Sequence, residues 1–560
     1  MKMTGAQIIV KLLERQGIKI IAGIPGGANL PIYDALSRQN RIRHVLTRHE
    51  QGAGFIAQGL ARISGQPQVC LATSGPGATN VITAIADAKL DSIPVICITG
   101  QVPLNMIGTD AFQEVDTYGL SIPITKHNFL VRSVSELCKV IPEAFRIAAS
   151  KRPGPILIDV PKDIQLSSVK INHWPSPGRP DLPPRFNLKD LKRAAELIAA
   201  SRRPVLYVGG GVIGSGASDW TITLSEKATI PMTMTLMGLG VMASDHPLYL
   251  GMLGMHAARH TNLAMKDCDL LIAAGVRFDD RATGRLETFC PNAKVIHMDI
   301  DPSEVHKLRS ANVGIIGDVK AILKALIPLV PRTSRPEWLG HILNLKKRFP
   351  LLNRATHSKS FPASLIKSAA ALLDPDTIIV TDVGQHQMWT AQYYPFKRPR
   401  QLLTSGGLGT MGFGLPTAIG AALANPLSQV VCFSGDGSLM MNIQELATAV
   451  EQKVNIKIIL MNNNALGLVQ QQQDLFYDRR IYASSYHFKV DFIKIAEGFG
   501  IKTFNLTGES DLVDTLGKAF DQKGPCLIHV PIDLTERVYP MVPPGAANIE
   551  MIGDDYDIAN

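Results

Sequence analysis

Residues 429–463 decide the fold class, and they read QVVCFSGDGSLMMNIQELATAVEQKVNIKIILMNN. The runs 430–433 and 456–460 are short and apolar without polar alternation, which is typical of strands buried on both faces of a parallel sheet. A helical pattern separates them, as the crossover between two parallel strands requires. The stretch therefore predicts a strand, a glycine-rich turn, a helix and a second parallel strand.

The same alternation recurs along the chain. Further apolar runs lie at 69–71, 95–98, 156–158, 205–208, 270–273 and 378–380. Residues 68–100 (QVCLATSGPGATNVITAIADAKLDSIPVICITG) repeat the strand, glycine-rich turn, helix and strand of 429–463. One shared architecture for both regions, or convergence of generic units, would produce this repeat. We expect an α/β protein with three domains, each a mainly parallel sheet flanked by helices.

Proline-rich breaks divide the 560 residues. The first, at 173–185, reads HWPSPGRPDLPPR, and a weaker one lies near 327–350. Proline disfavours both helix interiors and sheets, so both breaks predict linkers. The expected domains are 1–180, 186–345 and 360–540, followed by a C-terminal tail at 541–560.

Composition excludes several classes of protein. The formal charge of +9 comes from scattered basic residues, whereas a nucleic-acid-binding face needs concentrated ones. No uncharged apolar run is long enough to span a membrane. The seven cysteines show no zinc-ligand spacing, and no signal-peptide pattern precedes the first helical pattern. We expect a cytoplasmic protein with reduced thiols, no nucleic-acid partner and no membrane partner.

The strongest chemical signal is Gly435-Asp436-Gly437 followed by Asn462-Asn463. Glycines allow a ligand to approach the backbone closely, and the helix expected near Asn442 offers N-terminal amides to a diphosphate. Asp436 and Asn463 offer oxygen ligands from the ends of adjacent strands. A few protein oxygens with phosphate oxygens are typical of a magnesium site. A plain turn capped by an aspartate is the alternative.

These motifs resemble the thiamine-diphosphate enzyme superfamily. The resemblance implies that Asp436, Asn463 and the carbonyl of Ala465 hold Mg²⁺ on the diphosphate. It also implies that Glu50, in the run RHEQGA, hydrogen-bonds the cofactor's aminopyrimidine and promotes proton exchange, with a pKa raised by burial. In this superfamily the cofactor spans the interface between first and third domains of two subunits, so a homodimer or homotetramer is implied.

The same resemblance assigns the remaining cofactor contacts. Met411, in the run SGGLGTMG, matches the apolar wedge under the bent cofactor, although core packing is the ordinary role of a buried methionine. The other thiamine-diphosphate contacts would be Val383, Gly384, Gln385, His386, Gly409, Gly435, Gly437, Ser438, Leu466 and Gly467.

Within the superfamily, residues 4–545 or so resemble acetolactate synthases. The matching segments include GIPGG at 23–27, IGTDAFQE at 107–114 and VPKDIQ at 160–165. The resemblance implies that Gly27, Phe112, Gln113 and Lys162 line the active site. It assigns the catalytic role to these residues together with Glu50.

The middle domain resembles the FAD-binding domain of the biosynthetic members of that family. The run GVRFDDR at 275–281 carries most of this resemblance, and FAD would have a largely structural role. Arg281 could also attract the carboxylate of the second substrate, because guanidinium matches carboxylate in two hydrogen bonds. The FAD contacts would be Gly210, Gly211, His256, Arg277, Asp279, Asp280, Arg281, Asp299, Gly317, Asp318 and Val319.

The implied activity is decarboxylation of pyruvate on thiamine diphosphate and transfer of the hydroxyethyl unit to pyruvate or 2-ketobutyrate. The products, 2-acetolactate and 2-aceto-2-hydroxybutyrate, belong to branched-chain amino-acid biosynthesis. Leu468 and Gln472 stand where many members carry methionine and tryptophan, so we expect Gln472 to weaken the preference for 2-ketobutyrate.

Alternatives stay open at this point. Pyruvate oxidase and 2-keto acid decarboxylases belong to the same superfamily, and a catalytically silent scaffold subunit is the non-enzyme alternative. The resemblance also implies a separate small regulatory subunit, because this chain shows no segment like a small amino-acid sensor.

Overall fold

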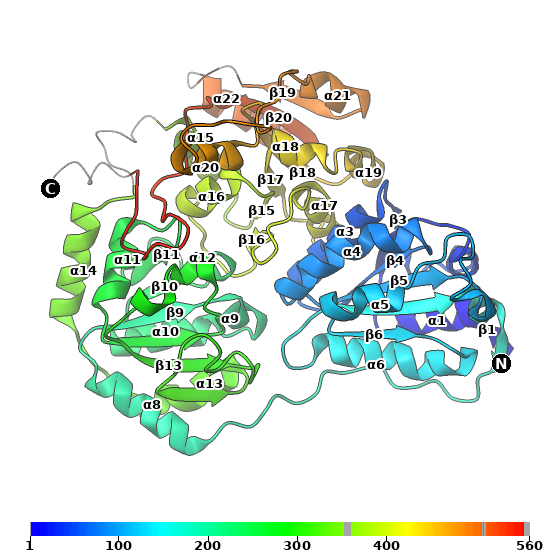
Figure 1. The fold of residues 1–560 in the computed structure, drawn as a ribbon, viewed down its shortest axis with the longest axis horizontal. Helices are drawn as coiled ribbons and strands as arrows, with labels where there is room; N and C mark the ends of the chain where they lie inside the picture. Colours follow the sequence, from blue (N-terminus) through cyan, green and yellow to red (C-terminus); the bar gives the residue numbers. More distant parts are fainter. Residues whose placement is uncertain (1, 352–359, 507, 509–510, 554–560) are drawn as a thin grey trace.

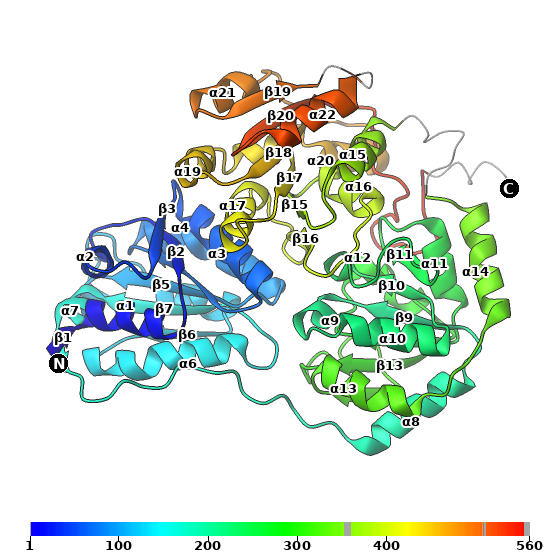
Figure 2. The same cartoon turned by 180° about the vertical axis from the view of Figure 1, so that it is seen from behind.

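The computed structural model describes residues 2–351, 360–506, 508 and 511–553 (Figure 1). The described residues form three six-stranded parallel sheets. They also form a two-stranded antiparallel pair of β1 (Lys2–Thr4) and β8 (Ser168–Lys170). The third domain contacts both of the others, as Figures 1 and 2 show from opposite sides. The α/β fold with three parallel-sheet domains is confirmed.

The first sheet has the strand order β3-β2-β4-β5-β7-β6. Its side chains alternate between two cores, so α1 and α6 cover one face while α3 and α4 cover the other. Thr4 and Gln7 form a capping box that starts α1. The elements are β2 (Ile20–Gly23), β3 (Arg43–Leu46), β4 (Gln68–Ala72), β5 (Val95–Gln101), β6 (His127–Leu130), β7 (Ile156–Pro161), α1 (Gly5–Arg15), α2 (Leu30–Ser37), α3 (Glu50–Ser64), α4 (Pro76–Leu90), α5 (Thr117–Ser121), α6 (Leu137–Ala149) and α7 (Lys162–Leu166).

The middle sheet has the order β11-β10-β9-β12-β13-β14. Counted within the domain this is 3-2-1-4-5-6, the order of doubly wound dinucleotide-binding folds, whose ligand crevice lies where the order reverses. Here the reversal falls between β9 and β12. The elements are β9 (Pro204–Val208), β10 (Met232–Met234), β11 (Tyr249–Met252), β12 (Leu270–Ala274), β13 (Lys294–Asp299), β14 (Val313–Ile316), α8 (Leu188–Ala200), α9 (Gly210–Gly214), α10 (Ser218–Ala228), α11 (Arg259–Asp267), α12 (Asp280–Thr283), α13 (Val319–Leu326) and α14 (Pro336–Arg348).

The third sheet has the order β16-β15-β17-β18-β20-β19, which is the order of the first sheet strand for strand. The repeat between 68–100 and 429–463 is therefore a shared architecture. The elements are β15 (Ile378–Thr381), β16 (Leu402–Leu403), β17 (Val430–Gly435), β18 (Ile456–Asn462), β19 (Lys502–Asn505), β20 (Cys526–Pro531), α15 (Phe361–Leu372), α16 (Gln385–Tyr393), α17 (Gly414–Ala424), α18 (Asp436–Met440), α19 (Glu445–Gln452), α20 (Gly467–Phe476), α21 (Phe492–Gly498) and α22 (Leu512–Asp521).

The first and third domains share a continuous apolar core. Helix α3 of the first domain lies along α17 of the third, and the rings of Phe55 and Phe413 meet edge to face at 5.4 Å. A Cβ at Gly59 would lie 2.4 Å from the Thr417 carbonyl oxygen, so glycine is what lets these two helices approach. This packing fixes the loops that precede α3 and α17.

One expected linker was wrong. The proline-rich stretch at 327–350 is not a linker, because Pro336 begins helix α14, whose Trp338 is buried against the middle domain. Proline is favoured at the first position of a helix, where no amide donor is needed. A short helix, α18, begins within the Gly-Asp-Gly motif at Asp436, and the helix expected near Asn442 is α19, which begins at Glu445. The break at 173–185 does lack helix and strand. Within the described residues, no helix is both long and apolar enough to cross a membrane.

Candidate cofactor and active site

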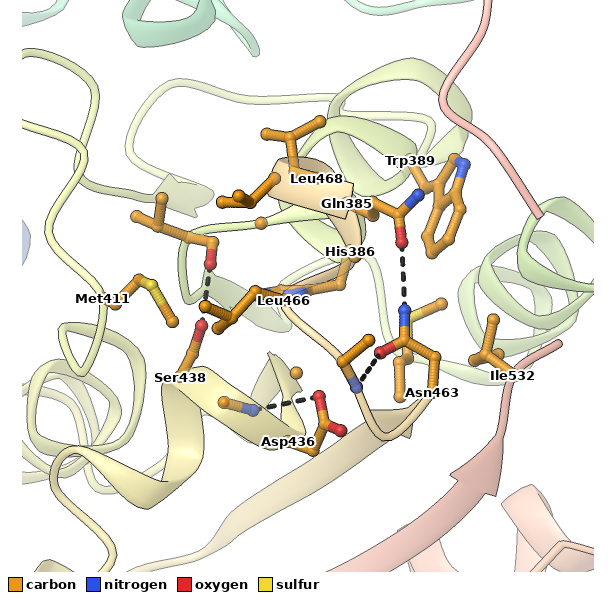
Figure 3. A pocket seen from close by; sticks show the side chains of 18 residues that line it. Gln385, His386, Trp389, Met411, Asp436, Ser438, Asn463, Leu466, Leu468 and Ile532 are labelled. Atoms are coloured by element: carbon orange, nitrogen blue, oxygen red, sulfur yellow. Dashed lines mark hydrogen bonds between the residues drawn. The ribbon is translucent and has the colours of Figure 1, made fainter. Parts of the chain in front are cut away.

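A pocket opens at the carboxyl ends of β15, β17 and β18 in the third domain (Figure 3). Thirteen of the fifteen residues expected to bind thiamine diphosphate line it together: Val383, Gly384, Gln385, His386, Met411, Gly435, Asp436, Gly437, Ser438, Asn463, Ala465, Leu466 and Gly467. Leu468, expected at the substrate, also lines it, whereas Gly409 and Glu50 do not. The motifs from 383 to 468 thus converge, because parallel strands end at one edge of a sheet.

Asp436 lies at this edge with one carboxylate oxygen unused. Its Oδ1 accepts a hydrogen bond of 2.9 Å from the Gly437 amide, whereas Oδ2 is buried without a hydrogen-bond partner among the described residues. Burial raises the pKa of Asp436 to about 6. A cation next to this carboxylate would favour its charged form.

Asn463 is held close to Asp436 by its neighbours. Its Nδ2 donates to Gln385 Oε1 at 3.1 Å, and its Oδ1 accepts from the Ala465 amide at 3.1 Å. Figure 3 shows the side chains of Asp436 and Asn463 toward the same end of the pocket. The described residues contain no cluster of three His, Cys, Asp or Glu side chains that could hold a metal. A cation here would thus rest on one carboxylate, one amide oxygen and a backbone carbonyl, as Mg²⁺ on a phosphate allows.

Two further features of the pocket suit a polar ligand such as a diphosphate. A Cβ at Gly467 would lie 2.1 Å from Gln385 Oε1 and 2.4 Å from Asn463 Nδ2, so only glycine keeps these polar groups together. His386 is buried, and its Nε2 has no hydrogen-bond partner in the described structure. Burial lowers the pKa of His386 to about 3, so the ring is neutral.

The loop at 404–412 brings Met411 to the pocket. Buried Asp382, at the end of β15, accepts hydrogen bonds from the amides of Gly412 at 2.9 Å and Gly414 at 3.0 Å. Burial raises the pKa of Asp382 to about 6, while these amides oppose the rise. The carboxylate therefore anchors the loop just after Met411, at the start of α17.

Glu50 is the first residue of α3, and its side chain turns toward its own domain. It is 9% exposed, and its Oε2 accepts from Asn80 Nδ2 at 3.0 Å. The third-domain residue Glu445 accepts from the amides of Arg48 at 2.9 Å and His49 at 3.0 Å, which fixes the entry to α3. Glu50 does not line the third-domain pocket of the same chain.

The other expected catalytic residues lie in the first domain, as Glu50 does. Gly27, Gln113 and Lys162 follow β2, β5 and β7, so they lie at the carboxyl edge of the first sheet. Phe112 is 87% exposed, so it is not a core residue of this chain. Gln113 has a φ of +58°, an unusual conformation for a side chain of its size. None of these first-domain residues lines the described third-domain pocket.

The expected FAD residues gather at the carboxyl edge of the middle sheet. The Gly211 amide donates to the Gly275 carbonyl at 3.2 Å, which joins the turns after β9 and β12 at the reversal point. Asp279 and Asp318 cap α12 and α13, so each also has a structural role. The remaining residues lie at the ends of β9, β11, β12, β13 and β14 at the same edge: Gly210, His256, Arg277, Asp280, Arg281, Asp299, Gly317 and Val319.

Burial separates the titratable residues at this edge. It lowers the pKa of His256 to about 4 and raises that of Asp299 to about 6. Both groups therefore favour their neutral forms. Arg281, in contrast, has a side chain 66% exposed, and its nearest carboxylate is Asp280 at 3.7 Å. Its Nη1 donates to Met255 Sδ at 3.8 Å, and most of the side chain stays exposed to solvent.

Helix α20 carries the two residues expected at the substrate. Leu468 lines the pocket, whereas Gln472 lies one helical turn later, half-buried and outside the lining. Its neighbour Gln471 is fully buried, donates to the Val538 carbonyl at 3.0 Å and accepts from the Val538 amide at 2.9 Å. The two adjacent glutamines thus have different surroundings.

Comparisons with known proteins agree across the whole chain. The models for thiamine pyrophosphate enzymes match three regions: the N-terminal TPP binding domain at 3–120, the central domain at 191–326 and the C-terminal TPP binding domain at 382–530. Acetolactate synthase isozyme 1 large subunit of Escherichia coli K12 is 59% identical over 553 residues, covering 99% of this chain and 98% of the relative. The chain belongs to the acetolactate synthase large-subunit family.

Other members of this family are similar over comparable lengths. Isozyme 2 large subunit of Escherichia coli K12 is 47% identical, covering 98% of this chain and 99% of the relative. A probable acetolactate synthase large subunit of Methanocaldococcus jannaschii is 46% identical, covering 97% of this chain and 94% of the relative. Membership in the acetolactate synthase family makes the chain a thiamine-diphosphate enzyme.

Sequence reasoning missed four lining residues of this acetolactate synthase pocket, namely Trp389, Met461, Val469 and Ile532. Trp389 follows Gln385 by one helical turn on α16, so helical spacing from an expected residue could have found it. Ile532 follows β20, which lies beside β18. Its position required the strand order, which no local motif contains.

Proposed function

We propose that this acetolactate synthase decarboxylates pyruvate and condenses the hydroxyethyl unit with pyruvate or 2-ketobutyrate, giving 2-acetolactate or 2-aceto-2-hydroxybutyrate. The observation that supports it most is the third-domain pocket, where the unpaired Asp436 Oδ2 lies among the residues expected to hold thiamine diphosphate. When bound, that cofactor supplies a carbon nucleophile that adds to the carbonyl carbon of the keto acid. It also delocalises the electron pair that remains when carbon dioxide leaves.

In this proposal Mg²⁺ rests on Asp436, Asn463 and the Ala465 carbonyl. Val383, Gln385, His386 and Ser438 then line the diphosphate end, and Met411 supports the cofactor from the loop before α17. Glu50 holds and moves a proton at the aminopyrimidine. Its burial beside α4 and the hydrogen bond from Asn80 fix the position of the carboxyl group for this role.

Homodimerisation is part of the proposal, because one chain leaves the site divided. The pocket of the third domain has no lining residue from the first domain, and Gly27, Glu50, Phe112, Gln113 and Lys162 lie at a different sheet edge. A second copy of the chain would bring the missing edge to each pocket. We propose a homodimer or homotetramer with sites between subunits, acting in the cytoplasm.

We propose FAD as a third cofactor, held by the middle domain. Its 3-2-1-4-5-6 strand order supports this, since the Gly209–Gly211 turn lies at the reversal point where dinucleotides bind such sheets. Loading the purified protein with FAD and measuring bound flavin absorbance tests this point. Arg277→Ala should reduce bound FAD, while Arg193→Ala on α8 should not.

Product analysis tests the whole proposal. The protein is supplied with pyruvate, thiamine diphosphate, Mg²⁺ and FAD, and each cofactor is omitted in turn. Acetolactate that requires thiamine diphosphate and Mg²⁺ supports the synthase. Acetaldehyde would instead assign the chain to the decarboxylases, and acetate coupled to acceptor reduction would assign it to pyruvate oxidase. No turnover of any keto acid, with thiamine diphosphate bound, would favour a silent scaffold.

A separate small regulatory subunit is the expected partner, because the relatives are named large subunits. The test compares acetolactate formation and valine sensitivity of the chain alone and with a co-purified small subunit. Full activity without any response to such a subunit would contradict this part of the proposal.

A further inference from the structure

The loop that carries Met411 is held by the first domain of its own chain. Residues 406–409 are exposed and contain Gly406, Gly407 and Gly409, the last with a φ of +68°. Such a glycine-rich segment loses much conformational freedom when it is fixed. Contacts from outside the loop must offset this loss if Met411 is to stay against the pocket.

Two carboxylates at the end of α4 provide these contacts. Asp87 Oδ2 accepts from the Ser405 hydroxyl and, at 2.8 Å, from the Thr410 hydroxyl. Asp91 accepts from the amides of Gly406 at 3.1 Å and Gly407 at 2.7 Å. The loop is therefore bonded to the first domain on both sides of its exposed glycines.

Arg62, on α3, holds the two carboxylates in place. Its Nη2 lies 2.7 Å from Asp91 Oδ2 and 3.6 Å from Asp87 Oδ1, and its Nη1 donates to the Thr404 carbonyl at 3.0 Å. All three charged side chains are almost fully buried. Burial of a charged triad is costly, and breaking one contact leaves an uncompensated charge. Apolar side chains could fill the same space if the cluster served only packing. The amides and hydroxyls of the 404–411 loop, in contrast, need the hydrogen-bond acceptors that the two carboxylates provide.

We propose that Asp87 and Asp91 are positioning residues for thiamine diphosphate, which fix the 404–411 loop so that Met411 supports the bound cofactor. This inference rests on the proposed function, because it concerns the same pocket. Neither carboxylate touches the pocket itself, so both act through the loop. Both ends of α4 then serve the site, since Asn80 near its start donates to Glu50 and Asp87 near its end accepts from Thr410.

The test compares Thr410→Val with Thr410→Ser. Valine keeps the shape and removes the hydroxyl that donates to Asp87, whereas serine retains it. We expect the dissociation constant of thiamine diphosphate, titrated at fixed Mg²⁺, to rise about tenfold in Thr410→Val and Asp87→Asn, as supporting residues of a site usually contribute. Thr410→Ser and the exposed first-domain control Asp34→Asn should stay within about twofold of the wild type.

Two readouts separate positioning from general damage. Hydrogen exchange of the apo protein should rise at 404–412 in Thr410→Val, and saturating cofactor should restore kcat with KM for pyruvate unchanged. Unchanged cofactor affinity in Thr410→Val, or a uniform rise in exchange over all three domains, would overturn the inference. A wild-type chain that binds no thiamine diphosphate would instead overturn the proposed function. If Asp87→Asn does not fold, the Thr410 pair alone decides.

Discussion

The first and third domains have the same strand order, yet equivalent loops carry different chemistry. After β2 and β15 come Gly27 and the 383–386 segment; after β3 and β16 come Glu50 and Met411. Asp436 follows β17 directly as the first residue of α18, whereas Thr73 and Gly75 lie in the turn after β4. One architecture thus presents a buried acid in one domain and the proposed cation ligands in the other.

This difference extends to the carboxylates that hold α3 and α17. Asp382 bonds the amides before α17 from its own domain, whereas Glu445 bonds the amides before α3 from the other domain. Burial raises the pKa of both groups. The two helices pack against each other, so each domain depends on its counterpart for the placement of its reactive loop.

The largest expected effect separates proton transfer from cofactor binding. Glu50→Gln should lower kcat about 10²–10⁴-fold, the usual contribution of a positioned acid or base. Glutamine can still accept the hydrogen bond from Asn80, so the affinity for thiamine diphosphate should change less than about tenfold. Steady-state kinetics and cofactor titration measure the two quantities.

The control for this prediction is Glu451→Gln, because Glu451 is a half-exposed carboxylate paired with Arg48 near the same loop. It should leave kcat within about twofold. A normal kcat in Glu50→Gln would contradict the proposed proton transfer by Glu50. The cofactor site of the third domain would then be the part of the proposal that still stands.

Asp159 and His529 occupy equivalent positions in the two sheets and predict opposite responses to pH. Gln101 Nε2 donates to Asp159 Oδ2 at 3.0 Å. At the equivalent position of the third sheet, Asn462 Nδ2 lies 3.0 Å from His529 Nε2. Burial raises the pKa of Asp159 to about 7 and lowers that of His529. Both residues are thus favoured in their neutral forms, an acid in one domain and a base in the other.

The sign follows from proton binding. Between about pH 4 and 7 folded Asp159 holds a proton that the unfolded chain has released, so the free energy of unfolding falls as pH rises. We expect this loss to be about 2–4 kcal/mol and to disappear in Asp159→Asn. Urea unfolding at pH 5 and pH 8 measures it. His529 acts oppositely, with stability lost as pH falls below about 6.5. Equal pH slopes in wild type and Asp159→Asn would contradict the assignment.

Asp436→Asn should weaken binding of thiamine diphosphate with Mg²⁺ by about 10–100-fold, since it removes the one carboxylate of the cation site. Titration with cofactor at fixed Mg²⁺ measures this change. Asp374→Asn, on the third-domain surface before β15, serves as the control. Wild-type affinity in Asp436→Asn would exclude the proposed cation site.

Mixing the variants tests which chain supplies each domain. In a Glu50→Gln and Asp436→Asn heterodimer, one site between subunits has both native residues. Re-associated mixtures should recover about a quarter of wild-type activity, because about half of the dimers are mixed and each has one intact site. No recovery would place Glu50 and Asp436 of one site in the same chain.

The sequence contained the local part of this arrangement. Apolar runs predicted the buried strands, and the spacing of Asp436 and Asn463 predicted two neighbouring strand ends. Contacts between distant segments were not accessible in this way. Glu445 accepts a hydrogen bond from the Arg48 amide, 397 residues away in the sequence, and Asp91 accepts one from the Gly407 amide, 316 residues away. These pairs depend on how domains pack, and no periodicity or motif encodes domain packing.

The smallest predicted effect concerns the loops that follow β5 and β18, because both carry residues expected at the substrate. In the first domain this segment exposes Phe112, whereas in the third it forms α20 with Leu468 in the pocket and Gln472 one turn beyond. Gln472→Trp would extend an apolar surface from that turn toward Leu468. We expect it to raise the preference for 2-ketobutyrate over pyruvate about tenfold, the usual contribution of one methylene in an apolar pocket.

Competition assays with both keto acids measure this ratio from the two products. Gln471→Trp is an unsuitable comparison, because buried Gln471 bonds Val538 and its loss would disturb the fold. Gln472→Leu is the better control, since it is apolar but lacks the reach of an indole, and it should shift the ratio less. Identical ratios in wild type, Gln472→Leu and Gln472→Trp would remove α20 from acceptor choice. Specificity would then reside in the first-domain loop around Phe112, and the two equivalent loops would differ in function as well as in form.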